Sequence, residues 1–270
     1  MSETRGENYR GWKGKTFRVG RTPSLRFGEG EAGRLGEYLG EFGGRRIALI
    51  TGAGSYERLP VREELERGLE VAGLSYRRFP VSGEPDPETV DKIRDRVLSF
   101  GGEVVLAVGG GSVMDTGKAV AAMCRHSGSV EEYLEGVGRK TAQGLRLPLI
   151  AVPTTAGTGA EAKNAVIGRL EEGGYKKSLR HEAFIPDIAV LDPRAGKSVP
   201  PEVTAASGMD AVTQLLEGYV STGASHFTDA LALDGLSRAA EALPRAVRNG
   251  EDLLARGETA YAAYLSGIVL

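Results

Sequence analysis

The sequence predicts an α/β fold, in which a parallel sheet covered by helices is followed by an all-helical region. Three observations lead to this prediction. Short apolar runs alternate with segments of helical spacing over most of the chain. Two of these runs end in turns rich in glycine, serine and threonine. Beyond about residue 196, alanine and leucine at helical spacing replace the apolar runs.

The apolar runs are short and are bounded by turn residues, as is typical of buried strands. Strands are expected at residues 46–51, 75–79, 104–108, 149–153 and 188–191. Helices with apolar positions at helical spacing are expected up to Leu39 and at residues 61–72, 88–99 and 119–123. Two hairpins are also expected, one pairing 16–19 with 24–27 and one pairing 165–170 with 175–179. This alternation predicts a Rossmann-like domain over residues 1–196.

The second domain is expected over residues 197–270, where strand signals are missing. The helical pattern still runs when the sequence stops at Leu270. We therefore expect a helical domain that is incomplete here, and an apolar face that a longer chain or a second copy would cover.

The composition argues against nucleic-acid-binding, disulfide-rich and membrane-spanning classes of protein. Hydrophobic residues make up 41% and charged residues 26%, as in ordinary globular proteins. A formal net charge of −2 offers no basic field for nucleic acid or for an anionic membrane. The single cysteine, Cys124, rules out an internal disulfide framework and suits the cytoplasm. No apolar run is long enough for a membrane span or a secretory signal.

The turn after residues 104–108 contains the strongest motif. Three glycines and a serine lead from the predicted strand into a helix. Backbone N–H groups would then lie without hydrogen-bond partners at the N-terminus of the helix, which is the positive end of its dipole. Ser112 would either cap this helix or donate to a phosphate. A plain strand-to-helix turn is the alternative, and three consecutive glycines favour the phosphate site. The residues are Gly109, Gly110, Gly111 and Ser112.

A second turn of this kind follows residues 149–153. Its hydroxyls are suited to ribose and phosphate oxygens, and the carboxyl ends of parallel strands face one crevice. The hydroxyl residues are Thr154, Thr155 and Thr158. Farther along, Asp210 and Gln214 lie one helical turn apart. From spacing alone, an acidic residue that complements the helix dipole is the preferred explanation of Asp210, ahead of metal or substrate binding.

Together these stretches resemble the iron-containing, or group III, alcohol dehydrogenases of the dehydroquinate synthase-like fold. The resemblance spans about residues 16–270 in the family's order. It is carried by residues 109–118, 153–161, 186–187, 192–193 and 208–211. It implies an oxidoreductase that transfers a hydride between a nicotinamide cofactor and an alcohol or aldehyde, and it implies a homodimer.

Site residues follow from the resemblance by position. The glycines, Ser112 and the three threonines would contact the pyrophosphate and the nicotinamide ribose. Asp115 matches a position near the nicotinamide, and either Lys176 or Lys177 matches a lysine that reaches the cofactor. These two lysines are equally well explained as a solvated pair on a hairpin.

The turn after residues 46–51 bears on the choice of cofactor. Where relatives that prefer NAD tend to have an acidic residue, this chain has Gly52, Gly54 and Ser55. Because no carboxylate would repel a 2′-phosphate, we expect NADP(H) to be preferred over NAD(H).

The metal site departs from the resemblance. Metal-dependent members use one aspartate and three histidines, of which Asp210 matches the aspartate. Gln214 stands where the first histidine is expected, and an amide oxygen is a poor ligand for iron or zinc. The other two histidines would lie beyond Leu270, so the chain is expected to be truncated relative to the family. Binding of iron or another divalent metal through Asp210 and Gln214 is left open.

Three hypotheses remain at this stage. The first is an NAD(P)-dependent alcohol dehydrogenase or aldehyde reductase, with Asp210 and Gln214 as the candidate catalytic residues. The second is a nucleotide-binding remnant without catalysis. The third is a metal-free reductase of the same fold, comparable with the maleylacetate reductases. Aldehyde-dependent oxidation of NADPH separates the first hypothesis from the second.

Overall fold

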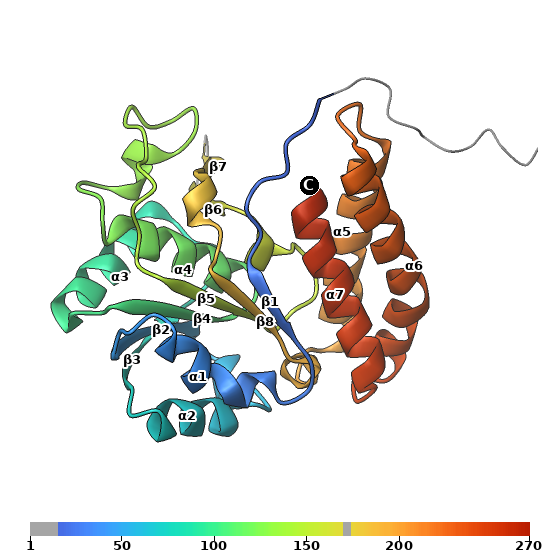
Figure 1. Ribbon diagram of the computed structural model, residues 1–270, viewed down its shortest axis with the longest axis horizontal. Helices are drawn as coiled ribbons and strands as arrows, with labels where there is room; N and C mark the ends of the chain where they lie inside the picture. Colours follow the sequence, from blue (N-terminus) through green and yellow to red (C-terminus); the bar gives the residue numbers. More distant parts are fainter. Residues whose placement is uncertain (1–15, 170–173) are drawn as a thin grey trace, which may run out of the picture.

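The computed structural model describes residues 16–169 and 174–270. Within these residues a six-stranded sheet, parallel throughout, forms the centre of the fold (Figure 1). Its strand order is β1-β8-β5-β4-β2-β3. The strands are β1 (Ser24–Phe27), β2 (Arg46–Gly52), β3 (Ser75–Val81), β4 (Val104–Gly109), β5 (Leu149–Pro153) and β8 (Ile188–Leu191). The predicted α/β fold is confirmed.

Helices cover both faces of the sheet. Successive side chains of a strand point to opposite faces, and β2 shows this with Leu49 in one apolar core and Ile50 in the other. Helices α1 and α2 cover the Leu49 face, whereas α3 and α4 cover the Ile50 face. The bounds are α1 (Leu35–Gly40), α2 (Arg62–Val71), α3 (Pro87–Phe100) and α4 (Gly111–Met123). Burial on both faces explains the uninterrupted apolar run of β4.

The strand order reverses between β2 and β4. From β2 the chain moves outward to the edge strand β3, and it then returns to place β4 on the other side of β2. At such a reversal the connections leave the sheet in opposite directions, which opens a crevice at the carboxyl ends of the strands. The turns that follow Gly52 and Gly109 lie at this reversal.

Three long helices follow β8 and stand beside the β1 and β8 side of the sheet (Figure 1). Their apolar side chains share a core with Ala189 and Leu191 of β8. The helices are α5 (Pro201–Val220), α6 (His226–Arg248) and α7 (Leu253–Val269). None of the helices in residues 16–169 and 174–270 is both long and apolar enough to cross a membrane.

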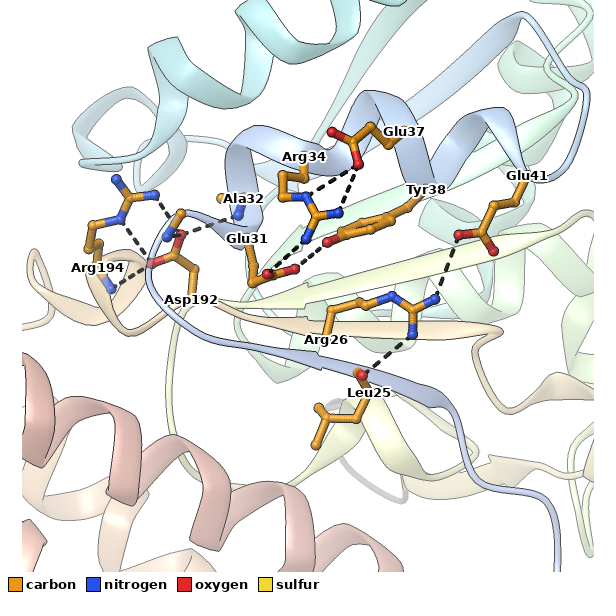
Figure 2. Close-up of polar contacts among 11 residues, drawn as sticks. Leu25, Arg26, Glu31, Ala32, Arg34, Glu37, Tyr38, Glu41, Asp192 and Arg194 are labelled. Atoms are coloured by element: carbon orange, nitrogen blue, oxygen red, sulfur yellow. Dashed lines mark hydrogen bonds and ion pairs between the residues drawn. The ribbon is translucent and has the colours of Figure 1, made fainter.

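Asp192, directly after β8, ties the N-terminal segment to the sheet (Figure 2). Its buried carboxylate accepts hydrogen bonds from the backbone N–H groups of Gly30, at 3.1 Å, and Ala32, at 3.2 Å. The Arg194 guanidinium lies 2.7 Å from the same carboxylate and balances its charge. Asp187 has a similar role before β8, because it pairs with Arg146 at 2.7 Å. These two motif positions therefore stabilise the fold.

Three local predictions had different outcomes. The hairpin of residues 16–19 with 24–27 is wrong, because residues 16–19 form no strand and β1 pairs in parallel with β8. The second hairpin is confirmed as β6 (Ala165–Arg169) and β7 (Tyr175–Leu179), while residues 170–173 of its predicted strand and turn lie outside the described residues. Ser112 does not cap α4, because the helix already begins at Gly111 with Gly110 as its N-cap.

Candidate functional site

A crevice opens at the carboxyl ends of β2, β4 and β5, where the strand order reverses. It collects predicted cofactor residues from three separate turns, together with residues from the start of α5. The predicted residues that line it are Gly52, Gly54, Ser55, Gly109, Gly110, Gly111, Ser112, Thr154 and Thr155. The structure thus brings the three predicted turns to one place.

The first turn of α4 forms one wall of this crevice. Gly110 is the N-cap in an extended conformation, and no side chain caps the helix. The backbone N–H groups at the start of α4 are therefore available to a ligand, and the helix dipole favours an anion there. A Cβ on Gly110 would lie 3.3 Å from Thr155 Oγ1, and one on Gly111 would lie 3.2 Å from Thr158 Oγ1. Glycine thus lets the two turns approach closely.

The turn after β2 forms the opposite end of the crevice and carries positive charge. A side chain on Gly52 would displace the Ser55 hydroxyl from its present position, so the glycine keeps this hydroxyl close to the end of β2. The exposed Arg58 lines the crevice beside Ser55. Glu57 lies between these two residues in sequence, but its carboxylate is paired with Arg62 and Arg78. A ligand phosphate at this end would meet arginine and hydroxyl groups.

Helix α5 lines the crevice on the side of the three long helices that follow β8. Ser207 lines the crevice, and a Cβ on Gly157 would lie 2.9 Å from the Ser207 Cβ. Asp210 and Gln214 follow on the same helix at spacings of three and four residues. The Gln214 amide donates to the Asp210 carboxylate at 3.0 Å, so the predicted pair is in direct contact.

Lys163, which was not predicted from the sequence, contacts the pair of Asp210 and Gln214. The Lys163 ammonium donates to the Gln214 amide oxygen at 2.6 Å, although the two residues are 51 positions apart in sequence. Burial, together with the nearby Lys118 ammonium, lowers the pKa of Lys163 below its ordinary value. We refer to Lys163, Gln214 and Asp210 as the lysine cluster.

The segment that carries Lys163 is fixed to α4. Lys118 is fully buried, and its ammonium donates to the backbone carbonyls of Ala160, at 2.6 Å, and Lys163, at 2.9 Å. The same ammonium forms an ion pair with Asp115 at 2.8 Å. Asp115 and Lys118 thus join the glycine turn to the segment after the threonine turn.

Glu161, between the threonine turn and Lys163, is a second buried titratable group. It lines a small cavity next to the crevice together with Thr154 and Thr155. Burial raises the pKa of its carboxyl to about 7, against the attraction of the Lys118 and Lys163 ammonium groups.

The remaining predicted residues lie elsewhere. Lys176 and Lys177 are exposed on β7, and Lys176 forms an ion pair with Glu84 at 2.7 Å. Neither lysine lines the crevice in the described part of the chain. Sequence reasoning missed Ser207 and Arg58 as well as Lys163. The available signal for Lys163 was its place directly after the second turn, where a charged residue within a largely apolar stretch needs a partner.

Comparison with known proteins agrees with this geometry. The profile of the family described as iron-containing alcohol dehydrogenase matches residues 22–193, and the profile of that family's C-terminal part matches residues 204–270. The chain belongs to the iron-containing alcohol dehydrogenase family. The predicted family membership is therefore confirmed.

Two relatives illustrate the similarity of this family member. It is 35% identical to long-chain-alcohol dehydrogenase 1 of Geobacillus thermodenitrificans over 91% of this chain and 62% of that protein. It is 32% identical to the NAD-dependent methanol dehydrogenase of Bacillus methanolicus over 91% of this chain and 64% of that protein. The chain thus spans somewhat less than two thirds of the length of these relatives.

Solved structures of the family share the fold. The sulfoacetaldehyde reductase of Bifidobacterium kashiwanohense, solved in complex with NAD⁺, superposes with a TM-score of 0.87 at 29% identity. The match covers 95% of this chain and 67% of that structure. A 1,3-propanediol oxidoreductase also superposes with a TM-score of 0.87 at 29% identity, over 94% of this chain and 66% of that structure.

The family's name implies iron, but the pair of residues that stands at the implied metal position in this chain, Asp210 and Gln214, does not fit a divalent metal ion. Gln214 offers a single amide oxygen, and that oxygen already accepts from the Lys163 ammonium. A cation beside this oxygen would face a positive charge at close range.

Proposed function

We propose that this chain binds a nicotinamide dinucleotide in the crevice and acts in hydride transfer between that cofactor and an alcohol or aldehyde. The observation that carries the proposal is the meeting of three turns, after β2, β4 and β5, at the reversal of strand order. The first turn of α4, which no side chain caps, can donate its backbone N–H groups to the pyrophosphate. The hydroxyls of Thr154 and Thr155 can bind ribose oxygens. When bound, the nicotinamide supplies or accepts the hydride.

Titration of the purified chain with NADPH, followed by an assay with short aldehydes, tests this proposal. We expect saturable binding of one NADPH per chain and aldehyde-dependent oxidation of NADPH. Binding without turnover would instead support the nucleotide-binding remnant. A chain that binds neither NADPH nor NADH would refute the proposal.

We further propose that NADP(H) is preferred over NAD(H). Support comes from Ser55 and Arg58 at the crevice and from Glu57, whose charge is neutralised by two arginines. Arg58→Ala should weaken NADPH binding about tenfold, as for loss of one exposed ion pair with phosphate, and leave NADH binding unchanged. Arg67→Ala, at another exposed arginine of the α2 region, is the control. Tighter binding of NADH than of NADPH by the unmodified chain would contradict this preference.

The other expectations are also proposals. Residues 1–196 would form the cofactor domain and residues 197–270 the start of a helical substrate domain. The homodimer is proposed from the family resemblance, and the cytoplasmic location from the single, unpaired cysteine, Cys124. Sedimentation analysis of the purified chain, at concentrations above and below micromolar, tests the dimer.

A further inference from the structure

The position where the resemblance implies a metal ion holds a lysine ammonium instead. Lys163 Nζ lies 2.6 Å from Gln214 Oε1, and Gln214 Nε2 lies 3.0 Å from Asp210 Oδ2. The amide is thus oriented at both ends, with its oxygen toward a cation and its N–H toward an anion. Gln214 is 7% exposed, so the amide is held within the fold rather than free in solvent.

The backbone beneath this ammonium is fixed, so Lys163 does not reach the site from a loose loop. Lys118 Nζ donates to the carbonyls of Ala160, Lys163 and Asn164, at 2.6, 2.9 and 3.1 Å. These three bonds attach the segment to α4, whose first turn lines the crevice. The backbone from which the Lys163 side chain extends is therefore held in place relative to the start of α4.

The lysine cluster also has charges around it that offset part of the cost of burying a cation. The carboxyl groups of Asp210, Glu161 and Asp115 attract the Lys163 ammonium, whereas burial and the Lys118 ammonium act against it and lower its pKa. Asp210 is exposed and Lys163 is half-buried, so the cluster is accessible from the solvent side. Ser207, one helical turn before Asp210, lines the crevice, which places the cluster beside the proposed cofactor site.

We propose that the Lys163 ammonium replaces the divalent metal ion in this protein, and that it binds and polarises the carbonyl oxygen of the substrate. Gln214 and Asp210 are then positioning residues that hold the ammonium in place. An ammonium N–H donates to a carbonyl oxygen and stabilises the negative charge that develops on it, which is the task a metal ion would perform as a Lewis acid. This inference rests on the proposed hydride-transfer function.

The metal side of the proposal is tested by calorimetric titration with Zn²⁺. The unmodified chain should show no stoichiometric zinc site. Gln214→His should gain little, because the ammonium remains, whereas Lys163→Met combined with Gln214→His should bind zinc at least about tenfold tighter than Gln214→His alone. Lys92→Met, at an exposed lysine, combined with Gln214→His is the matched control. Tight zinc binding by the unmodified chain, or equal affinities with and without Lys163, would overturn the proposal.

The substrate side is tested with a short aliphatic amide, an unreactive carbonyl analogue, added to the complex of the chain with NADPH. Lys163→Met should weaken amide binding at least about tenfold and Lys163→Arg should restore part of it. Neither variant should change NADPH affinity. Failure of the unmodified chain to bind NADPH would refute the proposed function itself. Normal NADPH binding, with amide affinity that is undetectable or independent of Lys163, would refute only the role of Lys163.

Discussion

The crevice and the lysine cluster are neighbours in the fold, but they are built in different ways. The crevice is made mainly of backbone, from glycine and threonine turns that each lie within a few residues of a strand end. The cluster is made of side chains, and its central contact joins Lys163 to Gln214 across 51 positions. A backbone site is encoded locally, whereas a side-chain site depends on how distant elements pack.

The difference extends to charge. At the crevice an anion is favoured by peptide N–H groups and by the dipole of α4, which no single substitution removes. In the lysine cluster the positive charge belongs to one side chain, and Gln214 and Asp210 fix its place. A substitution should therefore weaken the crevice only if the new side chain blocks the ligand or repels its charge. In the lysine cluster, by contrast, a substitution that removes one side chain should be enough.

The largest effect is expected from an added negative charge at the crevice. Gly111→Asp places a carboxylate beside the proposed pyrophosphate site, at a position where the nearest atom to a new Cβ is Thr158 Oγ1 at 3.2 Å. Repulsion of roughly 4 kcal/mol would weaken NADPH binding roughly a thousandfold. Fluorescence titration with NADPH measures this loss. Gly20→Asp, where nothing lies within 4 Å of a new Cβ, should bind NADPH normally. Unchanged affinity of Gly111→Asp would show that the cofactor binds elsewhere.

A somewhat smaller effect is expected from Glu161, whose buried carboxyl should make the free energy of unfolding depend on pH. The folded protein holds the proton of Glu161 up to a pKa of about 7, whereas the ordinary value is 4.5. The free energy of unfolding should therefore fall by about 3 kcal/mol as pH rises through this range, because the unfolded chain loses the proton first.

Glu161→Gln cannot ionise, so urea unfolding of this variant should lack that loss of stability between pH 4.5 and 7. Glu63→Gln, at an exposed position on α2, should follow the unmodified chain. The explanation fails if Glu161→Gln and the unmodified chain show the same dependence of unfolding on pH.

The smallest of the three effects concerns the amide of the lysine cluster. Gln214→Ala removes the group that accepts from Lys163 and donates to Asp210, and it should lower the free energy of unfolding by about 2 kcal/mol. Thermal or urea unfolding measures the change. Gln143→Ala, in an exposed loop, should be neutral. A neutral Gln214→Ala would mean that the amide does not hold the ammonium in place.

The same contrast explains how much the sequence could predict. The parallel sheet and the turns of the crevice were predictable, because buried strands are uninterrupted apolar runs and each glycine turn directly follows such a run. The contact of Lys163 with Gln214 was not, since nothing near either residue encodes how α5 packs against the segment after β5.

The first hairpin shows the opposite failure. Local pattern suggested that residues 24–27 pair with residues 16–19, yet β1 pairs with β8, some 160 positions away. All four residues of β1 pair with β8 at the edge of the sheet, and Asp192 anchors the chain that follows β1. Tertiary pairing thus overrides a local signal when the strand is short.

Hydrogen–deuterium exchange of the chain with and without NADPH tests the account most directly, because it locates the cofactor without requiring turnover. We predict protection at the turns after β2, β4 and β5, at residues 52–55, 109–113 and 154–158. Protection that is absent from these turns, or that is confined to other parts of the chain, would contradict the assignment of the crevice as the cofactor site.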